Sequence, residues 1–111
     1  MTIPSSLVLG PHLYKVDCSH DTALRLRADQ RRGDSHADSL LIRLDPDCPH
    51  TIAAETLLHE LLHMCWNQAA VNDIEGVEPH EEKIVAALSP LILELLRRNP
   101  DLADYLLKEE P

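Results

Sequence analysis

The sequence predicts an α+β fold in a single domain over residues 1–111, with a small antiparallel or mixed sheet of two or three strands packed on three helices. Three observations support this prediction. The chain has 111 residues, enough for one modest hydrophobic core and too few for two. Short segments of alternating apolar and polar residues lie in the first half, where strands are expected. Apolar residues at helical spacing dominate the second half, where the helices are expected.

Two segments of the first half predict strands. Residues 13–18 place alternate side chains on opposite faces, and residues 39–44 show a better alternation with one apolar face. Residues 19–32 are ambiguous, because a strand-like alternation is combined with a composition that also suits a helix. Residues 33–35, Gly-Asp-Ser, predict a turn.

The second half begins with a helix that is expected over residues 52 to about 70 and to lie at the centre of the fold. Asp47 or Thr51 could cap its start. A polar loop over residues 72–79 follows, and a second helix is expected to begin near Pro79 or His80.

The second helix is expected to bury a broad apolar stripe. Its apolar residues recur at spacings of three, four and seven: Ile84, Val85, Leu88, Leu91, Ile92, Leu95 and Leu96. Pro90 removes a backbone hydrogen bond and should kink this helix near Ala86 or split it. Asn99 is predicted to cap a short last helix, with Pro100 in its first turn and an apolar face of Leu102, Tyr105 and Leu106.

The first of these helices contains the sequence His59-Glu60-Leu61-Leu62-His63. Residues four apart leave nearly the same face of a helix, so both imidazoles can bind one metal ion. Glu60 is turned about 100° from His59, which suits a general base better than a ligand. The surrounding residues 57–66 are apolar, and burying these polar groups without a metal ion would be costly. The motif therefore predicts a zinc site with His59 and His63 as ligands.

A catalytic zinc ion usually has three protein ligands, so a third is expected elsewhere. One known pattern adds a glycine and a third histidine after the motif, but Trp66 and Ala69 occupy those positions. The remaining candidates are Glu81, Glu82, His80 and Asp73. Helical phase centres Glu81 on the apolar stripe and places Glu82 and His80 about 100° to either side. Glu81 is therefore the predicted third ligand, while His80 could instead help to hold a substrate.

The amino-acid composition limits the classes of molecule that the protein is expected to bind. The net charge of −9 and the lack of clustered Lys and Arg argue against binding nucleic acid. Residues 49–111 hold twelve acidic and four basic side chains, which would favour a protein or peptide substrate of basic character, although a solvated acidic face is the simpler explanation. No apolar stretch reaches the roughly 20 residues needed to cross a membrane, and the N-terminus lacks a basic start, so a cytoplasmic protein is expected.

The three cysteines are widely spaced and form no metal-binding pair. Cys18, Cys48 and Cys65 are expected to be reduced thiols. Cys65 follows His63 by two positions and is expected to lie in the core rather than to bind metal.

The segment from Thr56 to His63, together with residues 81–88 and 95–102, resembles the zincin metallopeptidases. The chain looks most like gluzincin-like minimal zincins: small SprT-like domains and compact peptidases of bacterial and prophage genomes. The resemblance covers about residues 39–106. It implies zinc held by His59, His63 and Glu81, beside a sheet whose edge strand, here residues 39–44, binds an extended peptide by strand addition. His80 replaces the asparagine that often precedes the third ligand in larger gluzincins.

These observations predict a zinc-dependent metallopeptidase in which Glu60 activates a zinc-bound water and passes its proton to the leaving amine. Four residues could donate a hydrogen bond to the oxyanion, and the sequence does not choose among them: Tyr14, Tyr105, His50 and His80. The alternative is a catalytically silent zinc-binding interaction module of the same fold, and a second alternative is a helical core without metal.

Overall fold

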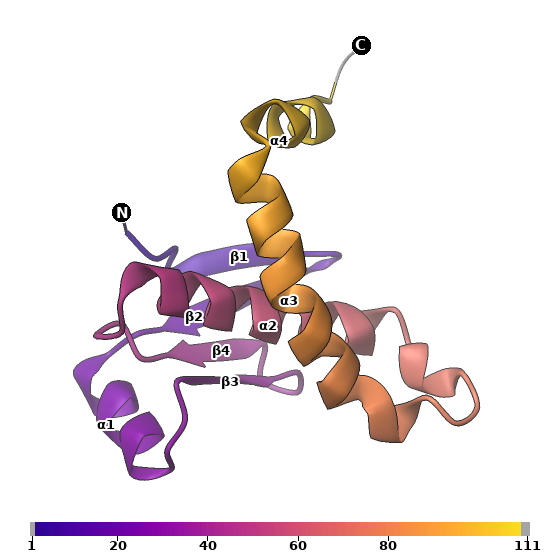
Figure 1. The fold of residues 1–111 in the computed structure, drawn as a ribbon. Helices are drawn as coiled ribbons and strands as arrows, with labels where there is room; N and C mark the ends of the chain where they lie inside the picture. The colour runs from indigo at the N-terminus through magenta and orange to yellow at the C-terminus, as the bar shows by residue number, and fades with distance from the viewer. Residues whose placement is uncertain (1, 110–111) are drawn as a thin grey trace.

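Four strands and four α-helices follow one another in the computed structural model, which describes residues 2–109 (Figure 1). In chain order they are β1 (Ser6–Leu9), β2 (His12–Asp17), α1 (His20–Ala28), β3 (Gly33–His36), β4 (Leu41–Leu44), α2 (His50–Gln68), α3 (Glu81–Arg98) and α4 (Pro100–Leu107). Two short 3₁₀ helices, Val71–Asp73 and Glu78–His80, lie between α2 and α3. The predicted α+β class is confirmed, although the part described has one more strand and one more helix than expected.

The strands form one mixed sheet in the order β1-β2-β4-β3. β1 and β2 form an antiparallel hairpin, β2 and β4 are parallel, and β3 is antiparallel to β4. The expectation that residues 39–44 form an edge strand is wrong, because β4 begins at Leu41 and lies between β2 and β3. The edge beside α2 is β3, which occupies the segment that had been expected to turn.

Gly33 explains how a Gly-Asp-Ser segment becomes this edge strand. A Cβ atom at position 33 would lie 2.8 Å from Cγ2 of Thr56 and 2.9 Å from the backbone oxygen of Arg43. The missing side chain therefore lets β3 pair with β4 while lying directly against α2. This packing outweighs the turn preference of the segment.

The ambiguous segment forms α1, capped by the hydroxyl of Ser19, which accepts a hydrogen bond from the Thr22 backbone. At the end of the sheet, Arg27 of α1 donates two hydrogen bonds of 2.8 Å to the carboxylate of Asp45. Arg27 also binds Asp47. Asp47 is therefore not the cap of α2, and neither is Thr51, since the capping position is Pro49 and no side chain caps it.

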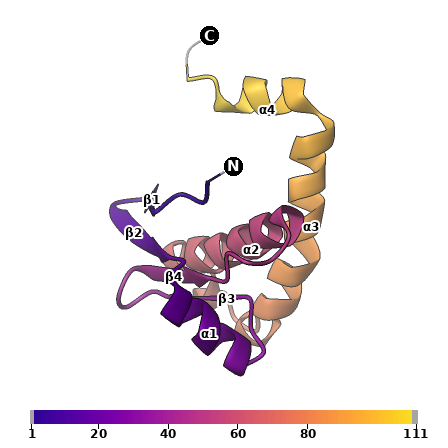
Figure 2. The same ribbon diagram turned by 90° about the vertical axis from the view of Figure 1, so that its left-hand side faces the viewer.

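α2 lies between the sheet and α3 (Figure 2). The main core is formed by Tyr14, Val16, Ile42, Leu44 and Met64, with Leu57 and Leu61 packed against it. Although the motif lies in the apolar run of residues 57–66, α2 is only partly covered, and its buried residues are Ala53, Glu60 and Met64. Cys65 is exposed rather than in the core, and like Cys18 and Cys48 it is a free thiol.

α3 is not split at Pro90, and the Ser89 hydroxyl donates to the carbonyl of Val85 within it. Its predicted stripe is only partly covered, because Leu88, Leu91 and Leu95 are 47%, 63% and 52% exposed. Asn99 is the capping position of α4, but its amide donates to Leu95 of the preceding helix. α4 extends from the end of α3, away from the sheet (Figure 1), and its expected apolar face is exposed at Tyr105 and Leu106.

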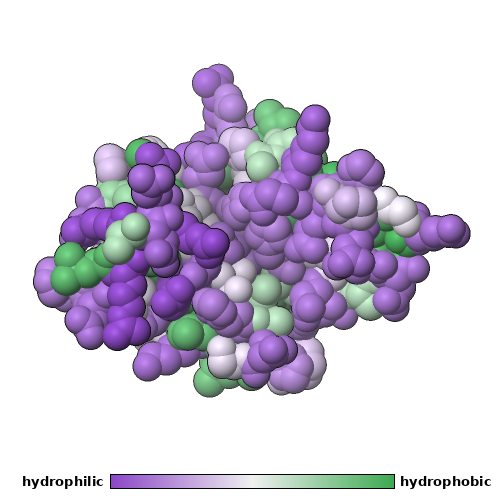
Figure 3. All heavy atoms as spheres, turned by 90° about the horizontal axis from the view of Figure 1, so that it is seen from below, coloured by the Kyte–Doolittle hydropathy of each residue, from purple (hydrophilic) through white to green (hydrophobic). Residues whose placement is uncertain are grey.

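From below, the surface is mainly hydrophilic, with hydrophobic side chains in small separate groups (Figure 3). Between residues 2 and 109, no helix has the length and apolar character to cross a membrane.

Candidate metal centre

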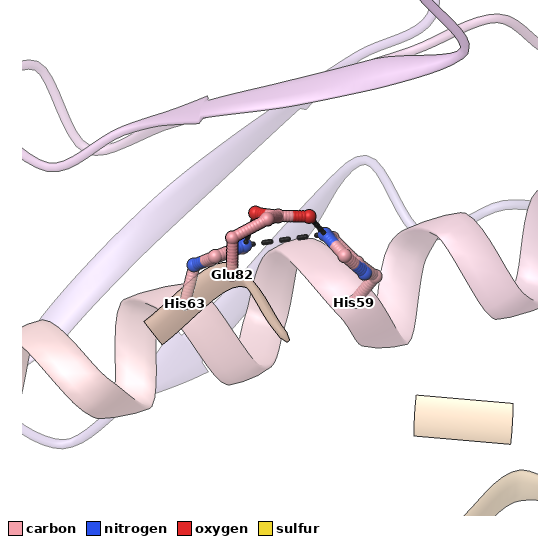
Figure 4. A group of neighbouring side chains, drawn as sticks. All are labelled: His59, His63 and Glu82. Atoms are coloured by element: carbon pink, nitrogen blue, oxygen red, sulfur yellow. Dashed lines mark hydrogen bonds and ion pairs between the residues drawn. The ribbon is translucent and has the colours of Figure 1, made fainter. Parts of the chain in front are cut away.

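His59 and His63 lie one turn apart on α2, and the first turn of α3 lies over them (Figure 4). Their Nε2 atoms are 3.1 Å apart. The carboxylate of Glu82 spans the pair, with Oε1 3.1 Å from Nε2 of His59 and Oε2 2.8 Å from Nε2 of His63. One ligand atom from each of these three residues can be chosen so that all lie within 4.8 Å of one another.

Two imidazoles and a carboxylate are a donor set that zinc takes in catalytic sites. Ligands about 2.0–2.2 Å from a tetrahedral ion lie roughly 3.3–3.6 Å from one another. The two Nε2 atoms are 3.1 Å apart, and each lies 3.1 or 2.8 Å from a different oxygen of Glu82. With one ligand atom from each residue the three lie within 4.8 Å, so side-chain adjustments would bring them to the spacing of a bound ion. The residues present therefore fit a zinc ion.

Glu81 contacts the other side of the same histidine. Nδ1 of His63 donates to Oε2 of Glu81 at 2.6 Å, and Asn72 donates to Oε1 of Glu81 at 3.4 Å. Trp66 in turn donates to the side-chain oxygen of Asn72 at 2.7 Å. Such an acceptor on the far nitrogen fixes the ring and its tautomer, and leaves Nε2 for a metal ion.

The structure thus brings together the predicted residues His59, His63, Glu60 and Glu81, but Glu81 and Glu82 differ in where they point. Glu82 faces the two Nε2 atoms, whereas Glu81 faces Nδ1 of His63. Helical phase favoured Glu81 because the apolar stripe was expected to be buried along all of α3. In the structure, much of the apolar stripe of α3 is exposed. Both carboxylates in the first turn of α3 contact His63.

The other candidate ligands lie outside this group. Asp73 and His80 are exposed, and His80 lines a separate apolar pocket with Ile74, Val77 and Ile84.

Glu60 is buried at 8% exposure and lines the same cleft as the two histidines. Its Oε1 accepts a hydrogen bond of 2.7 Å from the hydroxyl of Ser35 on β3. Ser35 was expected in a turn, and the sequence holds no local signal for this contact, because it depends on β3 packing against α2. The contact holds the Glu60 carboxylate in one orientation beside the histidines.

Negative charge surrounds His63. Burial disfavours its protonation, but the hydrogen bond to Glu81 and the charges of Glu82 and Glu60 outweigh this effect and raise the pKa of His63 above its ordinary value. An environment that favours a proton on this imidazole also favours a cation beside it.

The site opens into a cleft of about 850 Å³ between β3, α2 and the start of α3. The α1–β3 loop forms one end of its wall, with Gln30, Arg31 and Arg32. None of the four expected oxyanion donors lines it: Tyr14, Tyr105, His50 and His80. Tyr14 is in the core, where Gln68 donates a hydrogen bond to its hydroxyl. The volume is sufficient for a short peptide segment.

No protein-family model matches this chain, and comparisons with curated proteins and with solved structures also give no match.

Proposed function

We propose that this protein is a zinc-dependent metallopeptidase in which His59, His63 and Glu82 hold the ion and Glu60 is the general base. One observation carries the proposal: the three ligand groups and a buried glutamate line one cleft beside the free edge of a sheet. A purely structural site would have no need of Glu60 in this position.

In the proposed reaction, the zinc ion and the side chains of the protein have separate roles. When bound, zinc supplies a Lewis acid that lowers the pKa of water towards neutrality and polarises a carbonyl group. Glu60 takes a proton from the attacking water and delivers it to the leaving amine. Ser35 keeps the carboxylate of Glu60 in position through its hydrogen bond, and Glu81 orients the ring of His63.

The edge strand β3 offers a binding place for an extended peptide. The carbonyl of Arg32 accepts a hydrogen bond from the backbone N–H of Asp45, which follows β4. The backbone polar groups of residue 32 therefore point towards β4. Along an antiparallel strand, the backbone N–H and C=O groups of successive residues point alternately to one neighbour and to the other side. Those of Gly33 and Ser35 therefore point to the free edge of β3. A substrate strand paired there would lie beside Glu60.

The test compares the zinc-loaded protein with Glu60→Gln on an unfolded protein substrate. We expect cleavage by the native protein and a loss of at least about 100-fold in the variant, with close to one zinc per chain in both. Glu75→Gln, in the exposed loop after α2, is the matched control and should retain activity. Activity that survives in Glu60→Gln would refute the general-base assignment. Zinc bound at one equivalent without cleavage by the native protein would instead support the alternative, a catalytically silent zinc-binding module.

A further inference from the structure

Two arginines stand at one end of the cleft, in the loop between α1 and β3. Arg31 and Arg32 line the same cleft as His59 and Glu60, and both are exposed. Strongly hydrophilic side chains gather on the α1 side of the molecule (Figure 3). A positive group at a fixed distance from a reacting centre can select substrates by charge.

The backbone of both arginines is held in place. Gln30 has a φ of 58°, its backbone donates to Arg27, and the backbone of Arg31 donates to Leu26 at 2.8 Å. These two bonds form a Schellman motif, which fixes the chain direction at the end of α1. Arg32 is fixed in turn by its bond to Asp45. These bonds fix the backbone of both arginines and leave their guanidinium groups available.

Their charges are largely uncompensated. Arg31 comes only within 4.0 Å of Asp34, whose carboxylate is already bound by Arg43. No salt bridge between residues 2 and 109 involves Arg32. Asp34 and Glu55 are the acids that line the cleft near these arginines, and Asp34 is already paired with Arg43, so Glu55 is the one carboxylate without an arginine partner that faces the two positive charges.

The position of these arginines along β3 determines which part of a substrate reaches them. Arg32 precedes Ser35 by three residues, so it lies roughly 10 Å along the strand from the contact with Glu60. Antiparallel pairing is the commoner arrangement at a sheet edge. A peptide paired in that direction runs from Ser35 towards Arg32 as its own residue numbers increase. Residues after the scissile bond therefore pass the arginines.

We infer that Arg31 and Arg32 form a subsite for a carboxylate of the substrate, two to three residues after the scissile bond. The inference rests on the proposed function. Guanidinium groups bind carboxylates through paired hydrogen bonds, and both an acidic side chain and a free C-terminus offer this group. Residues 49–111 are acidic and suggested basic substrates, but at this end of the cleft they contribute Glu55 opposite the two arginines.

The first test maps cleavage sites in a peptide library by mass spectrometry. The native protein should prefer Asp or Glu two to three residues after the cut. In Arg32→Glu, kcat/KM for such peptides should fall about five- to twentyfold, and peptides with Lys at that position should gain. Arg25→Glu is the matched control, because Arg25 is exposed on α1 but does not line the cleft. Equal preference for acidic and basic peptides, or an equal effect of both variants, would overturn the inference.

The second test separates this subsite from catalysis. Zinc-loaded Glu60→Gln is titrated into fluorescein-labelled peptides that are amidated and carry either an Asp-Glu or an Asn-Gln pair, and fluorescence anisotropy is measured. The acidic peptide should bind at least fivefold more tightly, and Arg32→Glu should abolish the difference. Neutral peptides with a free C-terminus show whether a terminal carboxylate is accepted as well. Acidic preference without any cleavage by the native protein would overturn the proposed function alone, whereas equal binding of all peptides would overturn the subsite alone.

Discussion

The carboxylates of Glu81 and Glu82, although consecutive in the chain, contact opposite nitrogens of the same imidazole. Oε2 of Glu81 lies 2.6 Å from Nδ1 of His63, and Oε2 of Glu82 lies 2.8 Å from Nε2. The first turn of α3 thus provides both an orienting partner for His63 and a third candidate ligand. The two glutamates should therefore differ in what they contribute to zinc binding.

Replacing Glu82 should weaken zinc binding more than replacing Glu81. We expect Glu82→Gln to lose well over 100-fold in zinc affinity, because a ligand is removed. Glu81→Gln should lose about 10- to 100-fold, as is typical when the partner of a ligating histidine is changed. Competition with a chromogenic chelator measures both affinities.

The matched control for these variants is Glu78→Gln, since Glu78 is exposed and does not belong to the candidate ligand group of His59, His63 and Glu82. Its zinc affinity should match that of the native protein. A larger loss in Glu81→Gln than in Glu82→Gln would show that the helical-phase argument had identified the ligand correctly.

The motif residues could be found from the sequence because their relationship is local. His59, Glu60 and His63 need only a helix to share a site, and α2 is that helix. The choice between Glu81 and Glu82 could not be made in this way. It depends on the angle at which α3 crosses α2, which no spacing within either helix specifies.

Replacing Ser35 should impair turnover without affecting the metal. Ser35→Ala removes the hydrogen bond to Glu60, and we expect kcat to fall about tenfold while zinc affinity and KM change little. Ser35→Thr retains a hydroxyl and should restore part of the rate. Unchanged kcat in Ser35→Ala would contradict a positioning role for this side chain.

Gly33 should be intolerant of a side chain. Gly33→Ala places a methyl group within 3 Å of Thr56 and of the Arg43 backbone, and we expect a loss of about 1–3 kcal/mol in the free energy of unfolding. Urea denaturation measures this loss. Gly76→Ala is a useful comparison, because position 76 has open space but a φ of +81°, so any cost there is conformational. Stability of Gly33→Ala within 0.5 kcal/mol of native, about the scale of an ordinary surface change, would disprove the close approach.

Asp45 should contribute stability that depends on pH. Hydrogen bonds from Arg27 hold the pKa of Asp45 below its ordinary value, against the opposing effect of burial. Since the folded pKa is lower than the unfolded one, this contribution is complete above the ordinary carboxyl range near pH 4. It is lost as the pH falls through the folded value.

The variant Asp45→Asn should therefore be less stable than the native protein at pH 7, by about 1–2 kcal/mol. The difference should shrink as the pH is lowered below about 4, as measured by urea denaturation at each pH. Asp38→Asn serves as control, because Asp38 is exposed in the turn before β4. A difference that stays constant down to pH 2.5 would argue against this ion pair.

In the fold as well, elements that depend on local sequence patterns were predicted, and those that depend on tertiary packing were not. Alternation predicted β2 and most of β4, and helical spacing predicted α2, α3 and α4. β3 was missed, because Gly33, Asp34 and Ser35 form a strand only when β4 and α2 are packed beside them. Burial of the apolar faces of α3 and α4 was overestimated, since periodicity shows which residues share a face but not what covers it.

A crystal structure of the zinc-loaded protein, with anomalous diffraction measured at the zinc edge, would show which residues hold the ion. We expect one anomalous peak, bound by Nε2 of His59, Nε2 of His63 and the carboxylate of Glu82, while Glu81 still accepts the hydrogen bond from Nδ1 of His63. The absence of zinc at this place, or a zinc ion bound by Glu81 in place of Glu82, would contradict this expectation.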